Sequence, residues 1–173
     1  ERLKALGFKC VVIEDSDGKG GVHVWLFFAI PIPSKQAYEF AAWIARDYAQ
    51  YGLDGIEAFP KQSSVQKTGA KCGNYIRIPG RHHKRPHWSR FYGADGWLSI
   101  DESVHMLLSI GGDDPVLIPT LPPKELKAAL QKTKSAESKR YKGGSLTREG
   151  LERYISQTIG VAYTLKEAGN WTT

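Results

Sequence analysis

Several features are scarce in this chain, and each scarcity excludes a class of protein. Its only cysteines, Cys10 and Cys72, make neither a disulfide framework nor a CxxC metal pair. The longest apolar run, residues 22–33, is far shorter than the ~20 residues of a membrane-spanning helix, and no signal-peptide pattern precedes it. We therefore expect a cytoplasmic protein with no membrane partner.

Acidic residues are scarce relative to basic ones. The 173 residues include 18 Asp and Glu against 24 Lys and Arg, a net charge of +6. The excess lies in residues 61–90, which hold eight Lys or Arg and no acid. This distribution favours a polyanionic partner. With 41% hydrophobic residues, the chain suffices for one compact domain and is too short for two ordinary ones.

Apolar periodicity predicts an α+β fold. A glycine-rich turn at residues 16–21 separates two β-branched runs, residues 8–13 and 22–29, which is typical of a hairpin. Apolar residues on one face predict a helix from Ser34, as its N-cap, to Gly52, as its stop. Further predicted elements are extended segments at residues 56–59, 74–78 and 96–100 and a helix at 103–110. The order β-β-α-β-β-β is typical of α+β folds.

Proline and charge patterns divide the chain. A Pro-rich connector, residues 113–123, closes a first domain at residues 1–123. Residues 124–145 predict a basic, solvated helix that runs into a linker. Residues 146–173 have helical periodicity but too few large side chains for their own core, which predicts the start of a further domain. Because Glu1 lies in what resembles the end of a helix, we also expect sequence upstream of it.

The glycine-rich turn leads into Gly21-Val22-His23. Glycines before a strand let backbone N–H groups approach a phosphate, and an imidazole at the start of the strand can donate to the same group. Lys19 adds a positive charge. The alternative is an ordinary hairpin with a half-buried histidine. The acids before this turn, Glu14, Asp15 and Asp17, imitate a metal-binding pair, but we expect them to lie in the turn for conformational reasons.

Glu57 lies between apolar residues that are expected to enter the sheet. A carboxylate there is costly to bury unless a cation or a metal compensates its charge. The alternative is an edge-strand glutamate that faces water.

Residues 81–90 gather four Lys or Arg, three His and one Trp without an acid. Such a segment is typical of phosphate binding, with Trp88 available for stacking. One alternative is a solvated loop, which would normally include acids. A zinc site with Cys72, His82, His83 and His87 lacks a recognisable ligand spacing.

Together these residues resemble the archaeo-eukaryotic primase superfamily, in particular the primase-polymerase domains fused to helicases in mobile-element and bacterial replication proteins. That superfamily carries an acid-x-acid pair on a strand, a Ser/Gly-x-His on the next hairpin, and a single acid that ends an apolar strand. Gly21-Val22-His23 resembles the second motif and Glu57 the third, although Asp is more frequent there. Residues 74–80 resemble a downstream Gly-Asn-hydrophobic-hydrophobic-x-Leu-Pro element. The likeness covers residues 8–100 and implies that the acid-x-acid pair lies upstream.

The resemblance implies an RRM-like primase palm with a mostly antiparallel sheet and packed helices. It also implies DNA primase or polymerase chemistry, in which a hydroxyl attacks the α-phosphate of an NTP or dNTP and pyrophosphate leaves. Two Mg²⁺ or Mn²⁺ ions would stabilise the reacting oxygens. Implied partners are a single-stranded DNA template and a helicase domain, in a replication protein encoded by a prokaryote, phage or plasmid.

The resemblance also assigns roles to residues. The implied catalytic residues are His23, at the triphosphate with Lys19, and Glu57, as a metal ligand. Asn74 and Arg77 would contact nucleotide or template. The implied nucleic-acid ligands are Lys61, Arg81, His82, Lys84, Arg85, Trp88 and Arg90.

Two other classes of function stay open. One is a non-catalytic module that binds single-stranded nucleic acid through the basic segment. The other is a rolling-circle replication endonuclease, for which Tyr48 and Tyr51 offer a tyrosine pair. In that class His23-Val24-Trp25 has Trp where a second metal-binding histidine belongs.

Overall fold

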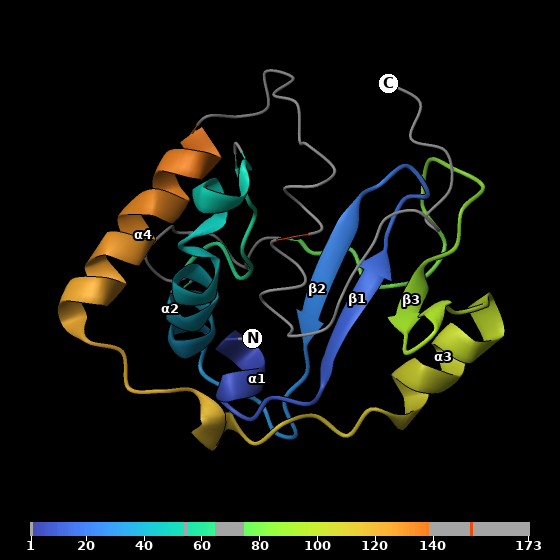
Figure 1. The fold of residues 1–173 in the computed structure, drawn as a ribbon, viewed down its shortest axis with the longest axis horizontal. Coiled ribbons are helices and arrows are strands. Elements are labelled where there is room, and N and C mark those ends of the chain that lie inside the picture. The colour runs from blue at the N-terminus through green and yellow to red at the C-terminus, as the bar shows by residue number, and fades with distance from the viewer. Residues whose placement is uncertain (1, 54, 65–74, 139–152, 154–173) are drawn as a thin grey trace. The chain divides into compact units, whose positions relative to one another are not determined.

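The computed structural model describes residues 2–53, 55–64, 75–138 and 153 (Figure 1). The described residues form two compact units, each assembled from separate stretches of the sequence. Unit 1 contains those within residues 1–7, 31–76 and 116–163, and unit 2 those within residues 8–30 and 77–115. The predicted sites fall in both units, so each unit is described by itself.

Unit 2 is built on a four-stranded antiparallel sheet. Its strands are β1 (Val11–Asp15), β2 (Val22–Leu26), β3 (Arg90–Gly93) and β4 (Gly96–Trp97), in the order β2-β1-β3-β4. Helix α3 (Ile100–Ser109) packs beside β3 (Figure 1). The buried apolar side chains of this unit are Phe8, Val12, Ile13 and Phe91. The α+β class and the antiparallel sheet predicted from the sequence are therefore confirmed.

The predicted hairpin is confirmed, but its first strand ends later than expected. Strand β1 pairs with β2 from Val11 opposite Leu26 to Asp15 opposite Val22. Glu14 and Asp15 thus belong to the strand, and both are buried. The expectation that these two acids lie in the turn was wrong, and of the three acids only Asp17 lies there. Burial of both carboxylates requires partners, which lie within unit 2.

The third strand of the sheet comes from a segment for which the sequence pattern predicted no strand. Residues 56–59 and 75–78 form no strand, and Asn74 lies outside the described residues. Instead, Arg90 and Phe91 of β3 pair with Asp15 and Glu14 of β1. Residues 75–78 lie outside the sheet: Tyr75 is 91% exposed, and Ile76 and Ile78 are exposed as well.

Helix α3 begins at a capping box. The Ser99 hydroxyl accepts from the Glu102 N–H, and the Glu102 carboxylate accepts from the Ser99 N–H. These bonds satisfy two amides that the first helical turn would otherwise leave unpaired. The predicted strand at 96–100 is consequently reduced to β4, and the helix starts at Ile100 instead of residue 103.

The described part of unit 1 is helical. It contains α1 (Arg2–Ala5), α2 (Ser34–Ala45), the 3-10 helix η1 (Tyr48–Tyr51) and α4 (Pro123–Ser138); a second 3-10 helix, η3 (Pro115–Leu117), lies where the chain passes from unit 2 to unit 1. Helix α4 packs against α2 (Figure 1), and Ala129 of α4 is buried. The helix predicted at the start of the basic stretch is thus confirmed to Ser138. The predicted linker and the helical tail lie outside the described residues, apart from Arg153, and the domain boundaries stay predictions.

The predicted helix over residues 34–52 is divided into α2 and η1. Its end is as expected, because Gly52 has φ +74°, a left-handed conformation that glycine adopts without strain. Its start differs: Pro33 occupies the N-cap position, and the Ser34 hydroxyl instead donates to the Gln62 carbonyl at 3.4 Å. No helix of the described residues has the length and apolar character to cross a membrane.

Candidate nucleotide and nucleic-acid interface

Glu14 is the most deeply buried charged side chain of unit 2, with 0% of its surface exposed. Its Oε2 accepts from Trp25 Nε1 at 2.7 Å and lies 3.0 Å from His23 Nδ1, and its Oε1 accepts from the Ser89 hydroxyl. Burial opposes ionisation, but the bonds from His23, Ser89 and Trp25 outweigh it and lower the pKa of Glu14 below its usual 4.5. The interior of unit 2 therefore holds a compensated carboxylate.

His23 is the outward partner of this carboxylate. It lies directly opposite Glu14 in the β1–β2 ladder, and its side chain is 43% exposed. Nδ1 points at Glu14, while Nε2 has no hydrogen-bond partner among the described residues. The predicted triphosphate ligand is therefore accessible through Nε2, on a ring that is held from behind.

The glycine-rich turn is closed by its own acids. The Asp15 Oδ1 accepts from the Gly18 N–H at 2.9 Å, and the Asp17 Oδ1 accepts from the N–H groups of Lys19 and Gly21, both at 2.8 Å. Burial of the Asp17 carboxylate opposes ionisation, but these amides and Arg85 lower its pKa below the usual 3.8. Three of the amides that could have met a phosphate are thus in use, which leaves the phosphate contacts to exposed side chains such as that of Lys19.

Residues 80–89 form a small β-hairpin, here called the basic hairpin. The Ser89 N–H donates to the Gly80 carbonyl at 2.9 Å, and the His82 N–H donates to the His87 carbonyl at 2.8 Å. Arg81 and Trp88 form a bridge between these two bonds, which places their side chains on the same face. The segment predicted as a basic loop is thus an ordered hairpin that leads directly into β3.

Three of the five Lys and Arg side chains in residues 77–90 are paired with the acids of β1 and the turn. Arg85 Nη1 lies 2.5 Å from the Asp17 carboxylate, and Arg90 Nη2 lies 3.5 Å from that of Asp15. Arg77 Nη2 donates to the Ser16 carbonyl at 2.7 Å and lies 3.7 Å from Glu14. An acid-free stretch holds together here because its counter-charges come from another part of the chain, an arrangement that composition alone did not predict.

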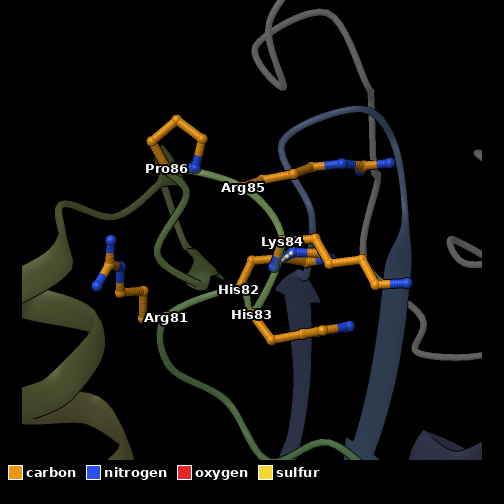
Figure 2. A pocket seen from close by; sticks show the side chains of 6 residues that line it. All are labelled: Arg81, His82, His83, Lys84, Arg85 and Pro86. Atoms are coloured by element: carbon orange, nitrogen blue, oxygen red, sulfur yellow. Dashed lines mark hydrogen bonds between the residues drawn. The ribbon is translucent and has the colours of Figure 1, made fainter.

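The remaining side chains of the basic hairpin face solvent. Arg81, His83 and Lys84 are exposed and form no ion pair with a described residue, and Trp88 is 49% exposed. Residues 81–86 line a concavity of about 440 Å³ (Figure 2). In Figure 2 Arg81 points away from the side toward which His83, Lys84 and Arg85 extend. The hairpin therefore presents positive charge in two directions.

His82 differs from the cations around it. Its ring stacks on that of His83, with centroids 4.9 Å apart. Partial burial and the charges of Arg77, His83 and Arg85 lower the pKa of His82 below its usual 6.5. At neutral pH His82 is therefore a neutral ring that can stack or accept a hydrogen bond.

Glu57 lies in unit 1 on a segment without regular structure. Its side chain is 65% exposed, and Oε1 lies 2.8 Å from Lys61 Nζ. Lys61 also lies over the Phe59 ring, 4.9 Å from its centroid. Since His23 belongs to unit 2, the implied role of Glu57 as a metal ligand beside the triphosphate of His23 stays a prediction.

No group of three or more His, Cys, Asp or Glu in the described part of the chain could hold a metal ion. For the zinc alternative, Cys72 lies outside the described residues, and His82, His83 and His87 form no such group with described side chains. Of the carboxylates nearest to His23, Glu14 is held by side-chain donors and Asp17 by turn amides. Asp15 accepts from a turn amide at Oδ1, whereas its buried Oδ2 has no hydrogen-bond partner among the described residues.

An antiparallel α+β unit that presents an imidazole from a hairpin, next to an ordered cationic hairpin, has the features expected of an archaeo-eukaryotic primase. A comparison with protein families establishes the primase class and identifies one family within it. Residues 1–112 match the family described as "TOTE conflict system, Archaeo-Eukaryotic Primase domain", and the chain belongs to this family. No curated protein and no solved structure shows a significant match to the chain.

The superfamily resemblance predicted from the sequence is thereby confirmed. Membership indicates primase-like nucleotidyl transfer or a related function, with nucleotide and nucleic-acid binding. The helicase fusion and the upstream acid-x-acid pair stay predictions.

Proposed function

We propose that this chain carries out templated nucleotidyl transfer, as a primase-polymerase in the replication of a mobile element or bacterial genome. A primer 3′-hydroxyl, or the hydroxyl of an initiating nucleotide, attacks the α-phosphate of an incoming NTP or dNTP. A new P–O bond forms, pyrophosphate leaves, and the proton of the attacking hydroxyl passes to solvent. The observation that carries the proposal is the geometry of unit 2: an accessible His23 Nε2 on the same hairpin as exposed Lys19, held by a network that also anchors the basic hairpin.

Each part of this site has a proposed task. His23 and Lys19 bind the triphosphate, because both present positive or hydrogen-bonding groups to solvent. Arg81, Lys84 and Trp88 of the basic hairpin bind the single-stranded template through phosphate contacts and base stacking. The remaining proposed ligands are His82, Arg85, Arg90 and Lys61 for nucleic acid and Asn74 and Arg77 for nucleotide or template, of which Asn74 lies outside the described residues.

Among these, the ion-paired arginines have a second task. Arg77, Arg85 and Arg90 hold the turn and β1 in place through Ser16, Asp17 and Asp15. Because their charges are already partly compensated, we infer that they contribute less to phosphate binding than Arg81 and Lys84 do.

Divalent metal ions are common in primase-like domains, but the described residues do not fit a metal centre. They contain no cluster of three ligands, and the Glu14 and Asp17 carboxylates near His23 are held by protein donors. We therefore derive no step through a metal. Glu57 is the residue proposed as a ligand, and its pairing with Lys61 makes its contribution open to direct test.

The function is tested by primer extension and nucleotide binding with the whole chain. On a primed single-stranded template with Mg²⁺ or Mn²⁺, His23→Ala should abolish incorporation and weaken nucleotide binding. Template binding without incorporation under any metal would favour the non-catalytic binding module. Strand nicking that depends on Tyr48 or Tyr51 would favour the rolling-circle endonuclease.

The metal role of Glu57 has a matched control in Glu39. Both carboxylates pair with a lysine four residues away, Glu57 with Lys61 and Glu39 with Lys35. Glu57→Gln should abolish metal-dependent nucleotide binding, whereas Glu39→Gln removes the same charge and an ion pair of the same spacing without effect. Equal behaviour of the two variants would exclude Glu57 as a metal ligand.

A further inference from the structure

We propose that Glu14 is a positioning residue that fixes the ring of His23 for nucleotide binding, an inference that rests on the proposed function. The carboxylate is fully buried and lies directly opposite His23 across the β1–β2 ladder. The sequence pattern did not assign Glu14 to the site. The role proposed for Glu14 rests on its burial and on its contacts with His23, Trp25 and Ser89.

The carboxylate is anchored from two sides before it meets His23. Trp25 Nε1 donates to Oε2, and the Ser89 hydroxyl donates to Oε1. The two lone pairs of Oε2 are shared between Trp25, at 2.7 Å, and His23 Nδ1, at 3.0 Å. A buried carboxylate with several donors is rigid, so the Oε2 lone pair that faces His23 has a fixed direction.

This geometry selects the protonation pattern of the imidazole. An ionised Glu14 accepts a hydrogen bond from a protonated Nδ1 but is repelled by an Nδ1 lone pair. The ring therefore carries its first proton on Nδ1, whereas free neutral histidine favours Nε2–H. Nε2 becomes the atom presented to ligand, and it donates to a phosphate oxygen when both ring nitrogens carry a proton.

The contact with His23 does more than compensate a buried charge. His23 is 43% exposed, so the ring that Glu14 holds remains accessible to ligand. Trp25 and Ser89 already provide one donor for each oxygen of Glu14. What the third bond adds is a fixed orientation of the ring, which is the property that a phosphate ligand requires.

The first test is spectroscopic and needs no ligand. In the whole chain, ¹⁵N shifts of the His23 ring should show a protonated Nδ1 above the pH at which the ring becomes neutral. A predominantly Nε2–H tautomer in the wild type overturns the proposal even if no variant folds. In Glu14→Gln the amide offers a donor as well as an acceptor, so the signals should move toward the Nε2–H tautomer.

Trp25→Phe is the matched control, because it removes a different bond to the same oxygen. It should leave Nδ1 protonated. A shift of the tautomer in Trp25→Phe equal to that in Glu14→Gln would reduce Glu14 to one member of a structural cluster and overturn the specific role.

The second test is a double-mutant cycle with ATP or dATP as the probe. His23→Ala and Glu14→Gln should each weaken binding, by roughly tenfold for the loss of one charge-assisted bond. The double variant should be no weaker than His23→Ala, because Glu14 acts through His23. Additive losses overturn the positioning role. Unchanged binding in His23→Ala instead overturns the proposed nucleotide site, and the tautomer measurement separates the two failures.

Discussion

At the scale of single residues, three acidic side chains organise the hydrogen bonds and ion pairs of unit 2. Glu14, Asp15 and Asp17 succeed one another around the β1–β2 turn, and each is held by donors from a different part of unit 2. A buried carboxylate stabilises a fold only while its donors remain, because removing them leaves an uncompensated charge. The stability of unit 2 should therefore depend on pH through these acids.

Glu14 gives the first prediction. Its pKa in the folded protein lies below the unfolded value of about 4.5, so its contribution to stability is complete above that pH and is lost as the pH falls through the folded pKa. Glu14→Gln should lower the free energy of unfolding by about 1–3 kcal/mol at pH 7, the range for bonds to a buried charge. The gap between variant and wild type should narrow as the pH falls below 4.5. Urea unfolding monitored by tryptophan fluorescence from pH 3 to pH 7 measures it.

Glu102→Gln serves as the control, because Gln also completes a capping box at this exposed position. It should be less destabilising than Glu14→Gln at pH 7. A gap for Glu14→Gln that widens on acidification would contradict the assignment of an ionised, hydrogen-bonded carboxylate.

His23 could be predicted from the sequence and Glu14 could not. The Gly-x-His pattern is local, and so are the glycines that make its turn. The role of Glu14 depends on Ser89, far along the chain, which becomes its neighbour only when β3 pairs with β1. A sequence signal did exist: the three acids at residues 14–17 and the acid-free basic stretch at residues 61–90 carry complementary charges.

At the scale of elements, the basic hairpin combines two kinds of cation. Arg85 is paired with Asp17 and forms part of the scaffold, whereas Lys84 at the adjacent position has no ion-pair partner among the described residues. Neighbouring residues of like charge should therefore respond differently to the same substitution.

Lys84→Ala should weaken binding of single-stranded DNA and flatten the log-log dependence of affinity on salt by about 1, as expected for one lost phosphate contact. Arg85→Ala should change the salt slope less, because Asp17 already compensates its charge, and should lower the unfolding midpoint more. Fluorescence anisotropy over a salt series measures the slope, and thermal unfolding measures the midpoint. Equal slopes for the two variants would contradict the division.

The turn of the β1–β2 hairpin depends on Gly18. It has φ +67°, and a Cβ there would lie 2.7 Å from Nδ1 of His87. Gly18→Ala should therefore cost about 1–3 kcal/mol through backbone strain and displacement of His87. Gly111→Ala is the control, since a Cβ there has no neighbour within 4 Å. Differential scanning calorimetry compares the two, and equal midpoints would exclude a special role for Gly18.

Local signals predicted the elements that they control and failed where pairing is long-range. The β1–β2 hairpin and the stop at Gly52 follow from turn glycines, and both are confirmed. Strand β3 was missed because its four residues, Arg90–Gly93, are too few to show a periodic pattern. They become a strand because β1 offers an unpaired edge and Phe91 enters the core.

At the scale of the whole molecule, the family match and the fold end at different residues. The match covers residues 1–112, but the next residue, Asp113, is buried and joins both strands of the hairpin. Its carboxylate accepts from the N–H groups of Lys9 and Cys10, and its backbone bonds to Phe27 and Ala29. The structural boundary of unit 2 therefore includes Asp113.

Three shortened chains test this boundary: residues 1–112, residues 1–122, and residues 1–122 with Asp113→Ala. All three lack α4, so differences between them come from Asp113 and the residues that follow it. We expect the chain of residues 1–122 to be the most stable and Asp113→Ala to lose about 2–4 kcal/mol, because two strand-end amides are left without acceptors. Amide hydrogen exchange at Lys9 and Cys10 reads out the two bonds directly. If residues 1–112 protect these amides as well as residues 1–122 do, Asp113 is not the closing residue of the sheet. If the Asp113→Ala chain is only as stable as residues 1–112, the Asp113 carboxylate accounts for the stability that residues 113–122 add.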